Sequence, residues 1–238
     1  MSQSIPPADD PFLSLKSGST EIYLIRHGDA LPGAEEVTPG GYDDQALSEV
    51  GRRQGQALGE RMKQIPLAAV YSSPIGRARQ TAGYIADALG LDVLIEPGLR
   101  EVALGPIGLL DGASPTADEI AAALKARLRE IAVIAVTTGS WSSIPGSEPS
   151  VELRARLVAA IGRIVAAHPG QRVAAVSHAG AINAYLASVL GIERDYFFPT
   201  ANTSISVLRV NGERRMLFSL NDIGHLLAAG LFSPDAAN

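Results

Sequence analysis

Two histidines in this sequence each follow a short apolar run and stand close before a glycine. His27 lies in the run 23–28, and His178 lies in the run 175–180. A neutral imidazole is a nucleophile or proton carrier, and its N–H can donate to an anion. One such histidine commonly does no more than complete hydrogen bonds at the end of a strand. Two in matching contexts point to a shared reactive site.

Two arginines accompany the histidines. Arg26 directly precedes His27. Arg77 lies in the first turn of a helix that is predicted to begin at Ser73, its N-cap, followed by Pro74. A guanidinium binds phosphate oxygens through paired, charge-assisted bonds more selectively than a lysine does. Its charge also disfavours protonation of a neighbouring imidazole. These residue types suit a site in which a neutral histidine faces a phosphate monoester.

Short apolar runs that alternate with helical patterns must position these side chains. Strands are predicted at residues 21–26, 68–72, 92–95 and 172–177, with a C-terminal hairpin at 203–210 and 214–220. Helices are predicted at 47–65, 73–89, after the capping box 116–119, at 153–165 and at 181–190. The fold class is therefore α/β, with a mostly parallel central sheet and helices on both faces. Such sheets bind ligands beyond the C-terminal ends of their strands, where the histidines and arginines converge if three of these strands are neighbours.

Length and composition limit the remaining choices. The 238 residues suit one domain, and 46% hydrophobic residues provide material for its core. A net charge of −5 argues against general binding to nucleic acid or anionic membranes, and the lack of cysteine rules out thiol chemistry and disulfides. Without a membrane span or a secretory signal, a cytoplasmic protein is expected. We expect a flexible tail at 1–19 and a single domain at 20–238, with a small helical and loop cap inserted at about 97–149.

Six segments, in order, resemble the histidine phosphatase superfamily, the phosphoglycerate mutase-like branch 1 group. The arginine–histidine–glycine motif alone is a weak signal, but the ordered set extends from residue 21 to about 226. The segments are Leu24–Gly28, Leu47–Gln54, Ser72–Ala82, Leu99–Glu101 with Gly105 and Gly112, Pro145–Glu148 and Val176–Ile182.

The resemblance implies a phosphatase fold and roles for three residues. His27 is expected to attack phosphorus and form a phosphohistidine, which divides one displacement into two. His178 is expected to donate to the equatorial oxygens in the transition state. Glu101 is expected to protonate the leaving alkoxide and then accept a proton from water, although Asp111 is a neighbouring candidate.

Two further residues are candidates for contact with the phosphate beside Arg26 and Arg77. Gly28 allows the backbone to turn close to the phosphate, or it serves a plain turn. The Ala179 amide is expected to face the phosphate from the start of a helix. His168 is interpreted as a surface turn residue and His225 as structural. The apolar residues of 102–110 suggest an apolar or aromatic leaving group, or they simply pack the cap.

The expected function is hydrolysis of phosphate monoesters without a cofactor or metal. Cofactor-dependent phosphoglycerate mutases of the family usually have a Trp–Asn pair after the first motif, whereas this chain has Asp29–Gly33 there. The interval from Glu101 to His178 is also shorter than a typical mutase needs. A mutase and a low-activity phospholigand-binding protein remain the alternatives. The expected partner is a small phosphorylated substrate, with no nucleic acid and no membrane; a homo-oligomer, a dimer first, is left open.

Overall fold

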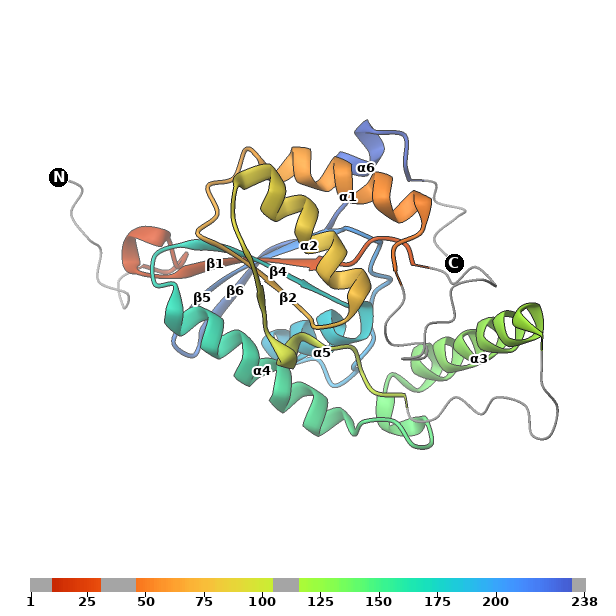
Figure 1. Ribbon diagram of the computed structural model, residues 1–238. Coiled ribbons are helices and arrows are strands. Elements are labelled where there is room, and N and C mark those ends of the chain that lie inside the picture. The colour runs from red at the N-terminus through yellow and green to blue at the C-terminus, as the bar shows by residue number, and fades with distance from the viewer. Residues whose placement is uncertain (1–9, 31–45, 105–115, 233–238) are drawn as a thin grey trace.

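Six strands form one sheet in the computed structural model, which describes residues 10–30, 46–104 and 116–232 (Figure 1). The strand order is β3-β2-β4-β1-β5-β6. β1 to β4 are mutually parallel where they pair, and β5 runs antiparallel to both β1 and β6. The strands are β1 (Thr20–Arg26), β2 (Ala69–Ser72), β3 (Val93–Ile95), β4 (Arg172–Ser177), β5 (Ile205–Asn211) and β6 (Arg214–Asp222). The prediction of a mostly parallel α/β sheet with a terminal hairpin is confirmed.

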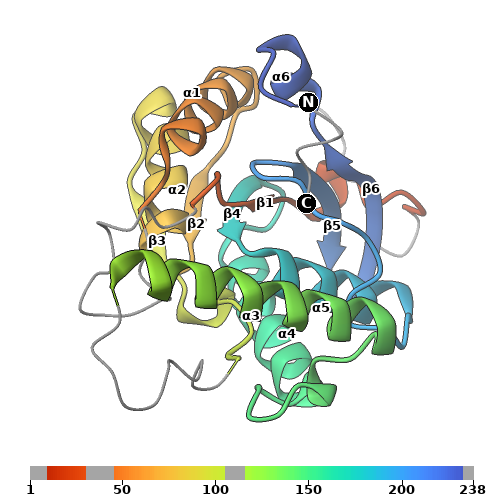
Figure 2. The ribbon, with the colours of Figure 1, turned by 90° about the vertical axis from the view of Figure 1, so that its right-hand side faces the viewer.

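Helices cover both faces of this sheet (Figures 1 and 2). α1 and α2 lie on one face, and α4 and α5 lie on the other, with α3 on the α5 side in both views. The helices are α1 (Glu49–Met62), α2 (Gly76–Leu89), α3 (Ala117–Thr138), α4 (Ser150–Ala167), α5 (Ala179–Leu190) and α6 (Gly224–Ala228). Short 3-10 turns are η2 (Leu15–Ser17), η4 (Pro97–Leu99) and η5 (Trp141–Ser143).

Alternation along the strands builds a core on each face. Leu24 and Ile25 are neighbours on β1, yet Leu24 packs with the α4 and α5 cluster and Ile25 with the α1 and α2 cluster. Successive side chains on a strand point to opposite faces, so a sheet covered on both sides has continuous apolar runs in its central strands. The completely buried run 173–176 of β4 shows this pattern.

Local signals place most helix ends. Ser48 caps α1 by accepting from the Gly51 N–H at 3.0 Å, and Gly90 ends α2 in the left-handed region at φ 65°. The predicted capping box at Thr116 and Glu119 is present. The predicted start of α2 is wrong, because the helix begins at Gly76 with Ile75 as its N-cap, and the Ser73 hydroxyl contacts His178, which follows β4.

The segment before β1 packs against the sheet. Leu13 is buried, and the Asn211 side chain donates to the Ser17 carbonyl at 3.0 Å. Arg214 donates to the Asp10 carbonyl at 2.9 Å. The packed part of the chain thus includes residues 10–19, ahead of the boundary at residue 20 that the sequence suggested.

The described part of the predicted cap shares the core of the α4 and α5 face. Ile131 of α3, Trp141 of η5 and Ile144 are buried in the same cluster as Leu153 and Tyr185. Val102 and Leu104 pack there too, as the packing alternative for this apolar segment requires; residues 105–110 lie outside the described ranges. Among the helices that the structure describes, none combines the length and apolarity needed to cross a membrane.

Candidate active site

Three neighbouring strands bring the predicted residues to one edge of the sheet. β4 lies between β2 and β1, with Arg26 paired to Ser177 and Ser72 to Val176. Because these strands are parallel, the residues that follow them emerge side by side. The rings of His27 and His178 have centroids 5.0 Å apart. The three strands are neighbours, which is the condition under which the sequence analysis expects the histidines and arginines to converge.

His27 is held as a neutral imidazole. Its Nδ1 lies 2.7 Å from the Gly28 carbonyl oxygen, which can only accept, so Nδ1 carries the proton. Nε2 then accepts from the Arg77 Nε–H at 3.1 Å. Burial and the charges of Arg77 and Arg26 hold the pKa of His27 well below its usual value. The result is a lone pair on Nε2 beside two guanidinium groups.

The two arginines come from different elements and are fixed by backbone contacts. Arg77 is buried in the first turn of α2, and Arg26 ends β1 and donates to the Thr200 carbonyl at 2.5 Å. Thr81, one turn beyond Arg77, donates to the Arg77 carbonyl at 2.8 Å and accepts from the Gly28 N–H at 3.0 Å. Thr81 thereby ties the start of α2 to the backbone beside His27.

His178 is the N-cap of α5 and is completely buried. Its Nε2 lies 2.9 Å from the Ser73 hydroxyl, and among the described residues Nδ1 has no hydrogen-bond partner. Burial, the neighbouring imidazole of His27 and the charges of Arg77 and Arg26 hold the pKa of His178 well below its usual value. A neutral ring that accepts from Ser73 at Nε2 keeps its proton on Nδ1, so that N–H can donate to an anion.

Glu101 caps the N-terminus of α5. Its carboxylate accepts from the N–H groups of Gly180 at 3.1 Å, Ala181 at 2.8 Å and Val102 at 3.0 Å. A helix N-terminus favours a negative charge and leaves its first N–H groups without intrahelical acceptors. The predicted proton donor is therefore an acceptor in this arrangement, at the same helix end as His178.

The other residues predicted to contact the phosphate or to donate the proton are Ala179, Gly28 and Asp111. Ala179 begins α5, but it is the next two N–H groups that bind Glu101. Gly28 is packed against α1, since a Cβ there would lie 2.8 Å from the Gly51 carbonyl oxygen. This close approach of backbones explains the glycine without a phosphate. Asp111, the alternative acid, lies outside the described residues.

The turn before β5 makes hydrogen bonds to the backbone of Arg26 and His27 that sequence reasoning did not identify. The Asn202 side chain donates to the His27 carbonyl at 3.0 Å, and the Thr203 N–H donates to the Arg26 carbonyl at 3.0 Å. The ring of His225 is buried and lies 3.1 Å from the Thr203 hydroxyl, consistent with the structural role expected for it. These partners are far from His27 in the chain, so no spacing in the sequence indicates them.

Two aromatic residues also flank this edge without a sequence signal. Trp141 meets Tyr196 edge to face with centroids 6.0 Å apart, and its ring packs on Gly180, where a Cβ would lie 2.8 Å from Cζ2. Burial raises the pKa of Tyr196, the charge of Arg26 opposes this, and the charge of Glu101 adds to it. Tyr196 therefore lies within electrostatic range of both site residues.

His168 is not part of this constellation, in agreement with its interpretation as a turn residue. Its ring is half-buried between Tyr71, whose hydroxyl lies 2.9 Å from Nε2, and Gln171 at 2.8 Å from Nδ1. Both ring nitrogens are occupied by neighbours of the fold, so His168 offers no reactive group to the site.

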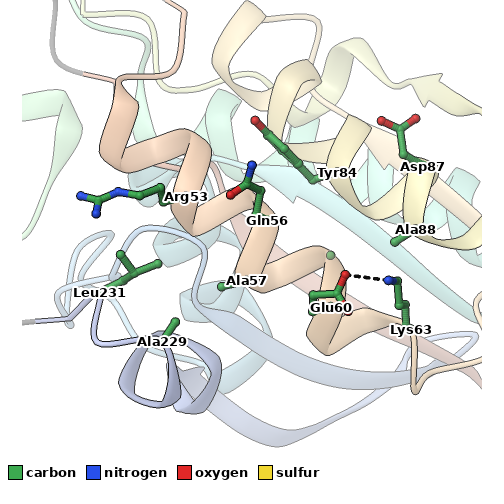
Figure 3. A pocket seen from close by; sticks show the side chains of 11 residues that line it. Arg53, Gln56, Ala57, Glu60, Lys63, Tyr84, Asp87, Ala88, Ala229 and Leu231 are labelled. Atoms are coloured by element: carbon green, nitrogen blue, oxygen red, sulfur yellow. Dashed lines mark hydrogen bonds and ion pairs between the residues drawn. The ribbon is translucent and has the colours of Figure 1, made fainter.

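A groove elsewhere on the molecule shares no residue with the site. It has a volume of about 730 Å³ and lies between α1, α2 and the segment after α6 (Figure 3). Tyr84, Asp87 and Leu231 line it, together with Glu60 and Lys63, which form an exposed ion pair at 2.6 Å. Its charges are of mixed sign, unlike those around His27. Among the described residues, no group of three or more His, Asp or Glu side chains is arranged to hold a metal ion.

Comparison with known proteins agrees with this geometry. The family model of the histidine phosphatase superfamily (branch 1) matches residues 22–223. A probable phosphoglycerate mutase, GpmB, of Erwinia tasmaniensis is 31% identical over 172 residues, or 72% of this chain and 75% of that protein. YhfR of Bacillus stearothermophilus has a similar structure, with a TM-score of 0.69 and 27% identity over 87% of this chain and 99% of that one. The mycobacterial glucosyl-3-phosphoglycerate phosphatase gives a TM-score of 0.63 and 27% identity over 85% and 99%.

Proposed function

Because the chain belongs to the histidine phosphatase superfamily (branch 1), we propose that it hydrolyses phosphate monoesters through a phosphohistidine on His27. The observation that carries the proposal is the state of His27. Its Nε2 atom is buried and carries no proton, and its lone pair accepts the Arg77 Nε–H at 3.1 Å. That is the form in which an imidazole attacks phosphorus.

In the first step, His27 Nε2 forms a bond to phosphorus while the bond from phosphorus to the ester oxygen breaks. A bound phosphate competes for the N–H groups of Arg77 and Arg26, which frees the lone pair and neutralises the oxygens. In this proposal the Nδ1–H of His178, which has no hydrogen-bond partner among the described residues, donates to an equatorial oxygen as charge builds up there. The leaving alkoxide takes a proton.

Glu101 is the proposed source of that proton and the later acceptor of a proton from water. Its carboxylate is an acceptor in the free protein, so the role requires that Glu101 take up a proton as the dianion enters. In the second step, water attacks the phosphohistidine, Glu101 accepts the proton of that water, and His27 leaves with its lone pair restored.

Hydrolysis is favoured over phosphoryl transfer to a second hydroxyl. The chain has Asp29 and Ala30 where the family's mutases usually have the first phosphate-side contacts after the histidine motif. Asp29 is used instead by the fold, since its N–H donates to Gln54 at 2.8 Å and its carbonyl accepts from the Ser48 N–H at 2.9 Å. The similarity to GpmB keeps the mutase as the reaction to test against.

We further propose that the reaction needs no metal. Arg26 and Arg77 supply the positive charge that a divalent ion provides in other phosphatases, and the N–H of the neutral His178 adds a hydrogen-bond donor. Activity is then expected to survive a chelator and to be inhibited by vanadate and inorganic phosphate.

The test is trapping of the phosphoenzyme. A ³²P-labelled monoester is mixed with wild-type protein, His27→Ala and, as a matched control, His168→Ala, and the label is followed after rapid quenching. We expect acid-labile label on the wild type and the control and none on His27→Ala. Parallel assays with p-nitrophenyl phosphate and 3-phosphoglycerate separate hydrolysis from mutase activity. Equal labelling of His27→Ala would contradict the assignment of the nucleophile.

A further inference from the structure

Arg156 of α4 uses all five of its N–H groups on one ion pair and one stretch of backbone. Nε and one terminal nitrogen bind the carboxylate of Glu148 at 2.8 and 2.7 Å. The other terminal nitrogen donates to the carbonyls of Gly98 at 2.8 Å and Arg100 at 3.0 Å. A weaker contact at 3.4 Å reaches the carbonyl of Glu101. A guanidinium has five N–H donors in a fixed plane, and a lysine could not reproduce this set.

Glu148 binds the backbone on the C-terminal side of Glu101. Its N–H donates to the Ala103 carbonyl at 2.6 Å, and its carboxylate faces the Ala103 N–H at 3.4 Å. Residues 98–103 are therefore held on both sides of Glu101. Beyond η4 this stretch belongs to no helix or strand, so no regular hydrogen-bond ladder fixes it. The Glu101 side chain reaches Gly180 and Ala181 from this held backbone.

We propose that Arg156 and Glu148 are positioning residues that set the Glu101 carboxyl for proton transfer to the leaving group. This inference rests on the proposed function. Neither side chain touches the reacting atoms, and both act through the backbone of residues 98–103. Proton transfer requires the donor within hydrogen-bond reach of the ester oxygen, and a displacement of about 1 Å can cost ~10²-fold in rate.

The same helix provides a matched control. Arg163 lies about two turns further along α4 and forms a bidentate pair with Glu96 at 3.1 and 2.7 Å. Glu96 caps η4, at the start of the same segment. Of the contacts that the described residues make with Arg163, none involves residues 100–103. Loss of Arg163 therefore removes a comparable ion pair without releasing the Glu101 backbone.

The first arm of the test measures position without activity. The Gly180 and Ala181 N–H groups lie in the first turn of α5, where no intrahelical acceptor exists, so their protection against hydrogen exchange depends on Glu101. Arg156→Met is expected to speed exchange at these two amides by ~10-fold. Arg163→Met is expected to leave them within ~2-fold. Unchanged exchange in Arg156→Met would overturn the positioning role.

The second arm measures proton transfer. Single-turnover rates are compared for an alkyl phosphate, whose leaving group needs a proton, and for p-nitrophenyl phosphate, whose leaving group needs it less. Arg156→Met is expected to lower the alkyl phosphate rate ~10- to 100-fold, the nitrophenyl rate less than ~3-fold, and KM little. In a Glu101→Gln background the same substitution should have almost no further effect, because the group that it positions is already lost.

Each other result has a defined meaning. Equal losses of rate for both esters in Arg156→Met, or an equally large loss in the Glu101→Gln background, would show that Arg156 only stabilises the fold. Either result would overturn the proposal. If Arg156→Met does not fold, as judged by thermal unfolding, Glu148→Gln replaces it, because this variant keeps the shape and removes the charge of the partner. If the wild type hydrolysed neither ester, the proposed function and the proton-transfer role would fail together. Hydrogen exchange at Gly180 and Ala181 would still show whether Arg156 and Glu148 hold Glu101 in position.

Discussion

The two ends of β1 differ in the charged groups that they bring together. At its start, the buried carboxylate of Glu21 accepts from Arg172 at 2.8 Å, Arg209 at 2.7 Å and the Tyr23 hydroxyl at 2.8 Å. At its other end, Arg26, Arg77 and His178 gather around His27, and the pKa values of both histidines are lowered. The first end pairs its buried carboxylate with two arginines, whereas the second brings two guanidinium groups close to neutral imidazoles.

The difference separates stability from function along a single strand. A buried ion pair that is broken on one side leaves an uncompensated charge, so the start of β1 should be sensitive in stability. Guanidinium groups beside a neutral imidazole interact favourably with a phosphate dianion that enters the site. The end of β1 should therefore be sensitive in activity.

The largest expected effect comes from Arg77→Met. Loss of this guanidinium removes a phosphate ligand and the N–H that faces His27, so kcat/KM for p-nitrophenyl phosphate should fall ~10³-fold. The free energy of unfolding should change by less than about 1.5 kcal/mol, because the methionine keeps much of the buried volume of the side chain. The pKa of His27 should rise, since one of the charges that lower it is gone. NMR titration of the His27 ring and steady-state kinetics measure both.

Arg79→Met is the control for that variant, since Arg79 lies on the same helix and is exposed. It should leave kcat/KM within ~2-fold and the pKa of His27 unchanged. If both variants lost activity equally, the active end of β1 would owe its sensitivity to the general charge of α2 and not to Arg77.

Glu21→Gln should give the opposite result. The amide keeps the shape but leaves Arg172 and Arg209 facing a neutral group, so the free energy of unfolding should fall by about 2 to 3 kcal/mol, with kcat/KM within ~2-fold. Urea unfolding and kinetics provide the measurements. Glu60→Gln, which breaks an exposed pair with Lys63, should cost less than about 1 kcal/mol. Loss of activity in Glu21→Gln at full stability would erase the contrast between the two ends.

The smallest effect is the pH dependence of the same pair. Burial raises the pKa of Glu21, but hydrogen bonds from Arg209 and Arg172 outweigh burial and hold it below its value of 4.5 in an unfolded chain. A carboxyl with a lowered folded pKa adds stability above the unfolded pKa, and this stability is lost as pH falls through the folded value. The wild type should thus lose its advantage over Glu21→Gln below about pH 4.5. A constant difference in Tm from pH 7 to pH 3 would contradict this linkage.

The sequence by itself determined most of the fold and indicated that His27, His178, Arg26 and Arg77 lie at one edge of the sheet. Periodicity and local caps such as Ser48, Gly90 and the box at Thr116 act over a few residues, so the printed sequence contains the information that they need. Parallel strands that end in His27 and His178 must present them at one edge once they are neighbours. The paired charges of Arg26 and Arg77 indicated an anion at that edge.

Only the tertiary structure decided how the site residues are held. The Ser73 hydroxyl, which local rules assign to a helix cap, binds His178, and α2 begins three residues further along, at Gly76. The Glu101 carboxylate binds the start of α5, Arg156 holds the backbone up to Glu101, and Glu148 holds it at Ala103. These contacts join segments far apart in the chain, and each depends on distances of about 3 Å between groups that packing alone brings together. Residue types and spacing carry no such distances, because they are fixed by how the layers pack and not by the order of the residues.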